Sequence, residues 1–446
     1  MTAEATHHTD AREVLEGLVR AGKVTDVMVA VPDLLGRLQG KIFNAPVFLE
    51  RMTGGTEMCA YVLATDVDMT PLSGFDLTGW DRGFGDLRVQ PDLDTVRMLP
   101  HRPQTALLIG SALHDDGTPV EVAPRRVLEA QLQRLRDLGY LVKAGVEAEF
   151  VLYTDSPTDW VPAWPDNLDY GLQHPPAADA FFRHLADTLS KAGIIHEAIK
   201  TEGAPGQAEV TFAYGEALKA CDDYAVFRHL VRDIAAQHGM IPAFMAAPQT
   251  GVGSGLHLHL SLWTEDGEPA FARHRGEDLP PLTERAVAGM LSALPHLAPL
   301  YAPTVNSYKR YWPHSFAPTR FNWGHDHRGC AIRVTGHGSG AHLEVRLAGA
   351  DANAYLALAA YTAAITHGIE EGLTPRPACD GDAYEELDSI PVPADLGEAL
   401  IRFADSTIAR RLLGKEVVQH YARAARAEFS FHRRHVTDVE RARGIR

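Results

Sequence analysis

Cysteine is scarce in this 446-residue sequence, which contains only Cys59, Cys221, Cys330 and Cys379. The four are far apart and none belongs to a C-x-x-C pair, so the sequence predicts neither a disulfide framework nor a zinc knuckle. Sparse, unpaired cysteines are typical of a reducing compartment. We therefore expect a cytoplasmic protein.

Long apolar runs and an excess of basic residues are also missing. No stretch approaches the roughly 18 continuous apolar residues of a membrane span, and residues 1–12 lack the apolar segment of a signal peptide. Lys and Arg number 42 against 58 Asp and Glu, which gives a net charge of −16. Nucleic-acid binding requires a basic face that neutralises phosphates. We therefore expect neither a membrane nor a nucleic acid as partner.

Glycine and proline punctuate short strand-like runs as far as about residue 110, and helix-like and strand-like segments alternate beyond it. The pattern predicts an α+β fold with a tail and short helix at 1–20, a small β-rich domain at 21–112 and a larger domain at 113–446. Within the first part, residues 1–10 are expected to be a loose tail. Further helices are predicted from Pro124 and at 179–192, 215–239, 282–293, 353–371, 396–413 and 417–434, and strands at 141–153, 208–213, 256–263, 331–335 and 342–347.

Several predicted strands place carboxylates and imidazoles on the face opposite their apolar residues, because side chains two apart share a face. An ordinary solvated strand face favours Thr, Ser, Lys and mixed charges, whereas clustered carboxylates need cations to neutralise them. Carboxylates with an imidazole and no thiolate suit Mg²⁺ or Mn²⁺. Glu147 and Glu149 lie on one predicted strand, and His257, His259 and Ser261 lie on another. Glu209 lies on a third, and a tight turn is expected to bring it towards Glu202. The last strand carries His342, Glu344 and Arg346.

Four arginines are interleaved with these carboxylates: Arg310, Arg328, Arg333 and Arg346. A guanidinium binds carboxylates and phosphates through paired hydrogen bonds, so the group predicts a clamp for an anionic substrate and a phosphoryl group. The sequence has no GxxxxGK[ST] loop, and the glycine-rich run at 251–255 fits neither that motif nor GxGxxG. Phosphate recognition is therefore expected to come from the arginines.

Six segments, in the same order along most of the chain, resemble elements of the glutamine synthetase family. They read GVEAEF at 145–150, EGAPGQAE at 202–209, VGSGLHLHLS at 252–261, NSYKR at 306–310, HRGCAIR at 327–333 and LEVR at 343–346. The resemblance implies an N-terminal β-grasp domain, a larger catalytic domain with a curved antiparallel sheet, and a homo-oligomer of two stacked hexamers. It also implies ATP and two or three Mg²⁺ or Mn²⁺ ions as cofactors.

Carried over residue by residue, the resemblance implies a role for each polar position. One metal ion would be held by Glu149, Glu202 and Glu209, and a second by Glu147, His257 and Glu344. L-Glutamate would meet Arg310, Arg346 and the backbone of Gly253. The ATP phosphates would meet Arg328 and Arg333, and the rest of the nucleotide would lie against His259 and Ser261. The catalytic residues would be Arg328, Glu344 and Arg346. The implied reaction phosphorylates the γ-carboxylate with ATP to γ-glutamyl phosphate, which an amine then attacks.

The segment after NSYKR departs from the ammonia-using members, where it reads VPGYEAP and its glutamate helps bind ammonium. Here 312–318 read WPHSFAP, so Phe316 stands at that place, and the family's DGSS element has no clear counterpart, Asp76 and Asp86 being the nearest candidates. Loss of anionic groups weakens the binding of a strongly hydrated cation, whereas an aromatic ring packs against carbon or contacts a cation.

These departures predict an organic amine as second substrate: ethanolamine, a polyamine or another alkylamine. The 80–86 run WDRGFGD, together with 315–318, is similar to γ-glutamylamine synthetases. Two alternatives stay open, a glutamine synthetase that uses ammonia and a non-catalytic regulatory member. Val252 replaces the family's usual asparagine, so a glutamate analogue also stays open.

Overall fold

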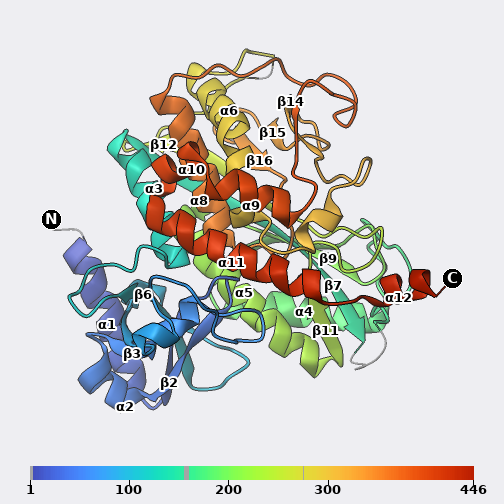
Figure 1. The fold of residues 1–446 in the computed structure, drawn as a ribbon. Helices are drawn as coiled ribbons and strands as arrows, with labels where there is room; N and C mark the ends of the chain where they lie inside the picture. The colour runs from blue at the N-terminus through green and yellow to red at the C-terminus, as the bar shows by residue number, and fades with distance from the viewer. Residues whose placement is uncertain (1–3, 155–159, 275, 446) are drawn as a thin grey trace.

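The computed structural model describes residues 4–154, 160–274 and 276–445. Helices and strands are interleaved around two main sheets, with the N-terminal sheet at one end of the molecule (Figure 1). The architecture is the expected α+β fold, a β-grasp N-terminal part followed by a larger catalytic part. Among the described residues, no helix combines the length and hydropathy needed to cross a bilayer.

The N-terminal sheet has the strand order β2-β1-β6-β4-β3, and β5 also pairs with β6. Its centre is the parallel pair of β1 and β6, in which Val27, Val29, Leu107, Leu108 and Ile109 are buried. The preceding helix α1 spans Glu4–Arg20, so the predicted loose tail at 1–10 is wrong from residue 4 onwards. The strands are β1 (Asp26–Pro32), β2 (Leu38–Asn44), β3 (Thr56–Cys59), β4 (Asp86–Pro91), β5 (Arg97–Met98) and β6 (Thr105–Leu113).

The catalytic part is built on a nine-stranded sheet of order β14-β15-β16-β12-β7-β9-β8, with β10 and β11 also paired to β7. All pairings are antiparallel except that of β14 with β15. Along β7 and β12 apolar and polar residues alternate, so one face of each strand packs in the core and the opposite face carries the polar side chains. The strands are β7 (Tyr140–Thr154), β8 (His196–Thr201), β9 (Gln207–Phe212), β10 (Gly215–Glu216), β11 (Met240–Ala243), β12 (Leu256–Thr264), β14 (Trp323–His325), β15 (Ile332–Thr335) and β16 (His342–Val345).

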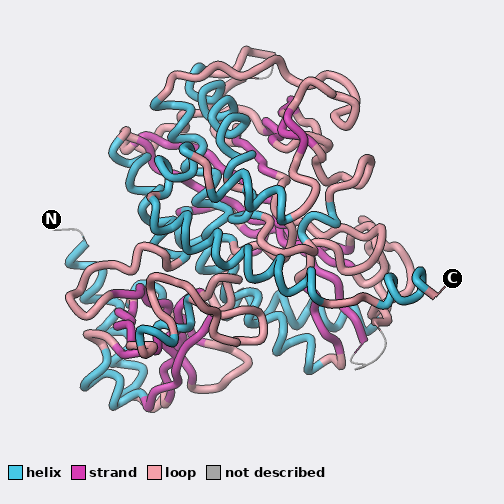
Figure 2. Tube along the Cα trace, in the orientation of Figure 1, coloured by secondary structure: helices cyan, strands magenta, loops and turns pink. Residues whose placement is uncertain are grey.

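Helices flank this sheet, and long loops join the elements around β14 and β15 (Figure 2). The predicted single helix at 396–413 is wrong, because it is split into α9 (Leu396–Ala404) and α10 (Thr407–Leu413). The Ser406 hydroxyl accepts a hydrogen bond from Ala409 N at 3.0 Å and so starts a new helix. The other long helices are α3 (Pro124–Asp137), α4 (Pro176–Lys191), α5 (Ala217–Gln237), α6 (Pro281–Ala293), α8 (Ala354–Glu370) and α11 (Lys415–Arg434).

Hydrogen bonds from the large part to the N-terminal part fix the two sheets relative to each other. Asn353, the N-cap of α8, donates from Nδ2 to Asp33 O at 3.0 Å. His420 of α11 lies with Nε2 2.8 Å from Leu63 O. These donors are buried, so the carbonyls they contact stay satisfied away from water.

Candidate active site

The register of the large sheet brings the predicted polar residues together. Glu147 of β7 lies opposite His257 of β12, and Glu149 lies opposite Glu209 of β9. On the other side of β12, His259 lies opposite Glu344 of β16. Directly opposite residues on neighbouring strands have their Cβ atoms about 5 Å apart. The polar faces of four neighbouring strands therefore form one continuous acidic surface.

The first cluster consists of Glu149, Glu202 and Glu209, whose nearest carboxylate oxygens lie within 4.8 Å of one another. Glu149 Oε2 accepts hydrogen bonds from Gly255 N at 2.8 Å and from Gln207 Nε2 at 3.1 Å, which orient its second oxygen. The Lys200 ammonium contacts Glu202. The structure thus gathers the three carboxylates as the sequence predicts, with one lysine as partial counter-charge.

The second cluster consists of Glu147, His257 and Glu344, with ligand atoms again within 4.8 Å of one another. His257 Nδ1 lies 3.3 Å from Glu147 Oε2 and 3.7 Å from Glu344 Oε1. Its Nε2 lies 3.7 Å from Glu149 Oε1, so the imidazole joins the two clusters. Five carboxylates and one imidazole therefore surround a single region.

Electrostatics show that this region is short of positive charge near the first cluster. Burial, followed by the charges of Glu147 and Glu149, raises the pKa of Glu209 to about 9. Burial also acts to raise the pKa of Glu344, but Arg346 and His257 outweigh it and lower the pKa to about 2. A set of oxygen donors with one imidazole and an excess of negative charge fits Mg²⁺ or Mn²⁺.

Two buried arginines lie against the clusters, Arg310 and Arg346, each 5% exposed. Arg346 contacts the Glu344 carboxylate, and its Nη1 lies 3.5 Å from His257 Nδ1. Arg310 Nη2 lies 3.4 Å from His257 Nε2, and its Nη1 donates to Arg346 O at 3.1 Å. Both guanidiniums therefore lie directly beside His257, between the two carboxylate clusters.

Glycines keep this corner open. A Cβ on Gly255 would lie 2.5 Å from His257 Nε2 and 2.9 Å from Arg310 Nη2, so any side chain there would fill the space between them. Gly253 is close by, because Gly253 O accepts a hydrogen bond from Gln207 Nε2 at 2.9 Å. The backbone of 253–255 can therefore approach a substrate closely.

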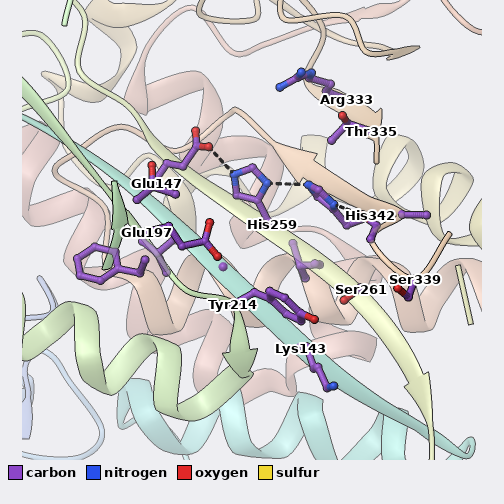
Figure 3. A pocket seen from close by; sticks show the side chains of 17 residues that line it. Lys143, Glu147, Glu197, Tyr214, His259, Ser261, Arg333, Thr335, Ser339 and His342 are labelled. Carbon is purple, nitrogen blue, oxygen red and sulfur yellow. Dashed lines mark hydrogen bonds and ion pairs between the residues drawn. The ribbon is translucent and has the colours of Figure 1, made fainter. Parts of the chain in front are cut away.

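A cavity of about 310 Å³ lies beside the clusters, between β7, β12 and β16 (Figure 3). Glu147, His259, Ser261 and Arg333 line it. His342 Nδ1 donates to Gly340 O at 2.7 Å, so its Nε2 accepts from His259 Nδ1 at 3.0 Å. The predicted nucleotide-side residues thus share one cavity with a predicted metal ligand.

The other predicted residues lie around this centre in different ways. Arg333 donates from Nη1 to Glu344 at 2.7 Å, whereas Arg328 is exposed between β14 and β15 and forms no hydrogen bond or ion pair with any described residue. The Phe316 ring is 67% exposed, while its carbonyl accepts from Arg346 Nη2 at 3.3 Å. Asp76 lines a separate cavity, and Asp86 begins β4.

Sequence reasoning left several residues of the cavity without a role. Lys143 shares the polar face of β7, so its parity could have identified it, and its ammonium lies 3.5 Å from the centre of the Trp263 ring. His342 was on the predicted polar face but had no assigned partner. Glu197 and Tyr214 also line the cavity, and they come from segments whose position depends on the sheet order.

Comparison with known proteins identifies the family. Residues 121–443 match the family model described as the glutamine synthetase catalytic domain. A Streptomyces coelicolor protein named gamma-glutamylethanolamide synthetase GlnA4 is 42% identical over 442 residues, covering 97% of this chain and 95% of its own. A Pseudomonas protein named glutamate–isopropylamine ligase is 33% identical over 413 residues, or 90% of each chain.

Solved structures agree with this fold. A structure described as a GmaS/ADP complex has a TM-score of 0.86 and 25% sequence identity, and the match covers 97% of this chain and 99% of that one. A second, described as a novel glutamine synthase homolog, has a TM-score of 0.81 at 28% identity, covering 94% and 97%. The chain belongs to the glutamine synthetase family of ligases.

Proposed function

We propose that this chain ligates an organic amine to the γ-carboxylate of L-glutamate with ATP, through γ-glutamyl phosphate, releasing ADP and phosphate. The observation that carries the proposal is the placement of Arg310 and Arg346 against five clustered carboxylates, with Phe316 adjoining Arg346. The names of the relatives from Streptomyces coelicolor and Pseudomonas support an organic amine.

Divalent cations would be held by the two clusters, one by Glu149, Glu202 and Glu209 and another by Glu147, His257 and Glu344. Such cations, two or three Mg²⁺ or Mn²⁺, would supply Lewis-acid stabilisation of phosphoryl oxygens. The protein's own contribution is the preset geometry. Gly255 N and Gln207 orient Glu149, and Arg333 and Arg346 orient Glu344, so these two carboxylates are held in place before a cation binds.

Glutamate would be oriented by the buried guanidiniums of Arg310 and Arg346, with the backbone of Gly253 alongside. Buried arginines bind carboxylates strongly because water does not compete for their hydrogen bonds. His259 and Ser261 would line the nucleotide side of the cavity, and Arg333, with Arg328 from the adjoining loop, would stabilise charge on the transferring phosphoryl group. Glu344 and Arg346 adjoin both parts of the site and are the central residues of this proposal.

A free carboxylate is a poor acyl donor, because its leaving group would be oxide. Phosphorylation makes the leaving group inorganic phosphate, and the amine nitrogen then attacks the acyl carbon. Phe316 is exposed beside Arg346, and its aromatic ring stands where the ammonia-using members carry a carboxylate. The ring favours the carbon chain of an amine such as ethanolamine, an alkylamine or a polyamine over a bare ammonium ion.

The proposal also includes a homo-oligomer, two stacked hexamers, in the cytoplasm. Neither Asp76 nor Asp86 is among the residues that line the cavity, and the proposal assigns the base for the amine to a neighbouring subunit. Mass photometry of the purified protein tests the assembly. A particle of twelve chains is expected, and a monomer at assay concentration would contradict this part.

The decisive test is phosphate release from ATP with L-glutamate and a panel of amines: ethanolamine, isopropylamine, putrescine and ammonium. We expect at least one organic amine to give a higher kcat/KM than ammonium, with the γ-glutamylamide identified by mass spectrometry. Faster turnover with ammonium would indicate a glutamine synthetase. Absence of ATP consumption with every amine, in folded metal-loaded protein, would indicate a non-catalytic member.

A further inference from the structure

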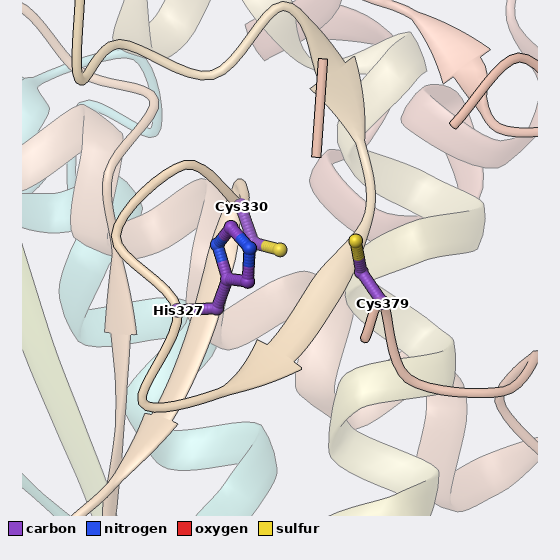
Figure 4. Close-up of side chains that lie close together, drawn as sticks. All are labelled: His327, Cys330 and Cys379. Carbon is purple, nitrogen blue, oxygen red and sulfur yellow. The ribbon is translucent and has the colours of Figure 1, made fainter. Parts of the chain in front are cut away.

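Cys330 and Cys379 are 49 positions apart in the sequence but adjacent in the fold (Figure 4). Their sulfur atoms and one ring nitrogen of His327 lie within 4.8 Å of one another. Cys330 lies in the loop between β14 and β15, and Cys379 N donates to Trp323 O of β14 at 2.8 Å. The sheet edge therefore holds the two thiols side by side.

Both ring nitrogens of the neighbouring His327 form hydrogen bonds with the backbone. Gly329 N donates to His327 Nδ1 at 3.1 Å, so the ring proton sits on Nε2, which donates to Gly381 O at 2.8 Å. A metal-binding imidazole needs one nitrogen with a free lone pair. His327 thus braces the two segments, and the reactive pair is the two thiols.

The two cysteines differ in access. Cys330 is fully buried, and burial followed by the proximity of Cys379 raises the pKa of its thiol. Cys379 is partly exposed, and its Sγ lies 3.7 Å from Gly381 O. An oxidant in solution therefore reaches Cys379 first. The proximity of the two sulfur atoms then allows Cys330 to attack, and the raised pKa of its thiol makes this second step the slower one.

We propose that Cys330 and Cys379 form a thiol oxidation site, in which a hydroperoxide oxidises the two thiols to a reversible Cys330–Cys379 disulfide. The Cys379 thiol is oxidised by hydrogen peroxide to a sulfenic acid with release of one water. The Cys330 sulfur then attacks the Cys379 sulfur, the S–O bond breaks, and the Cys330 proton leaves with the hydroxyl as a second water. The two thiols lose two electrons and the peroxide gains them. A dithiol reductant reverses the reaction by exchange.

The location of this pair gives the disulfide a consequence for the site. Arg328 lies between His327 and Cys330, and Arg333 follows shortly after. Sulfur atoms must approach to about 2.05 Å to bond, so the disulfide would tie the loop that carries Arg328 to the segment at 379–381. This effect on turnover rests on the proposed ligase function, whereas formation of the bond does not.

Thiol titration and non-reducing peptide mapping of the full-length protein, before and after hydrogen peroxide, test the proposal. We expect four titratable thiols in denatured reduced protein to fall to two, with a linked peptide pair containing Cys330 and Cys379. Cys379→Ser should abolish the linked pair, and Cys330→Ala should do so independently. Cys59→Ser, which removes another partly exposed thiol, should keep it.

Activity supplies the second readout. Turnover of the wild type should fall roughly tenfold after peroxide and recover with dithiothreitol. The Cys379→Ser variant should show no such loss. Retention of four thiols under peroxide, or a stoichiometric zinc ion that survives dialysis and protects both sulfurs, would overturn the proposal. If no amine supports turnover, the ligase function fails while the peptide map still tests the disulfide.

Discussion

The acidic sheet face and the loop at 312–318 differ in what holds them in place. On the sheet face, strand register and hydrogen bonds set each group, and Glu344 has no exposed surface. In the loop, His314 and Phe316 both have φ of 59°, and Trp312 is 64% exposed. A positive φ costs a non-glycine residue roughly 1 kcal/mol or more. The carboxylates and arginines of the acidic face are therefore held by the sheet, while Phe316, which we expect to select the amine, lies on a strained surface loop.

Glu209→Gln, on the acidic sheet face, is expected to have the largest effect. It removes one of the carboxylates proposed to hold a metal ion, so turnover should fall by about 10³-fold. It also removes a buried carboxyl whose pKa is raised to about 9, so the metal-free protein should melt at a higher temperature. Phosphate release and thermal melting, each with and without Mg²⁺, measure both signs. Glu265→Gln, on an exposed turn, is the matched control and should change neither.

Arg346→Lys and Arg328→Lys compare what the buried and the exposed guanidinium contribute to the use of glutamate. Lysine cannot contact Glu344 and the Phe316 carbonyl together, so kcat/KM for glutamate should fall by about 10²-fold. Arg328→Lys should leave the KM for glutamate almost unchanged, because Arg328 is expected to act on phosphate. Equal effects of the two substitutions on the KM for glutamate would contradict this division of roles.

Phe316→Glu tests whether the loop at 312–318 selects the amine. A carboxylate at this exposed position adds an anionic partner for ammonium and removes the apolar surface for carbon, so the ratio of kcat/KM for the preferred amine to that for ammonium should drop by about 30-fold. Phe316→Tyr keeps the ring and should retain the ratio. A ratio unchanged by both substitutions would place amine selection elsewhere.

His420 provides the smallest expected effect and a reference outside both regions. Burial lowers the pKa of this imidazole to about 4. Below its unfolded pKa of about 6.5 the unfolded chain takes up a proton that the folded chain does not, so stability falls as pH decreases towards 4. Between pH 7 and pH 5.5 His420 should cost about 1 kcal/mol. Urea unfolding of His420→Gln at both pH values should show a smaller pH dependence than wild type.

Regular elements explain why much of the site could be predicted from the sequence. Alternation along β7 and β12 puts Glu147, Glu149, His257 and His259 on one face, and that prediction needs no tertiary information. Position in the sheet order needs more, since Glu197 reaches the cavity only because β8 pairs with β9 at the sheet edge.

Loop geometry was beyond the sequence. Nothing in the spacing of Cys330 and Cys379 indicates that they meet, because their approach depends on the pairing of Cys379 with Trp323. The division of the helix at 396–413 followed from Ser406 acting as a cap, a signal that competes with the helical periodicity around it. Local sequence patterns therefore predict which side chains share a face of a strand or helix, whereas contacts between loops become visible only in the tertiary structure.

Anomalous diffraction from crystals of the protein grown with Mn²⁺ and a non-hydrolysable ATP analogue tests the central claim most directly. We expect one manganese peak among Glu149, Glu202 and Glu209 and another among Glu147, His257 and Glu344, with the nucleotide in the cavity lined by His259 and Arg333. Nucleotide bound there with manganese absent from both clusters would contradict the account.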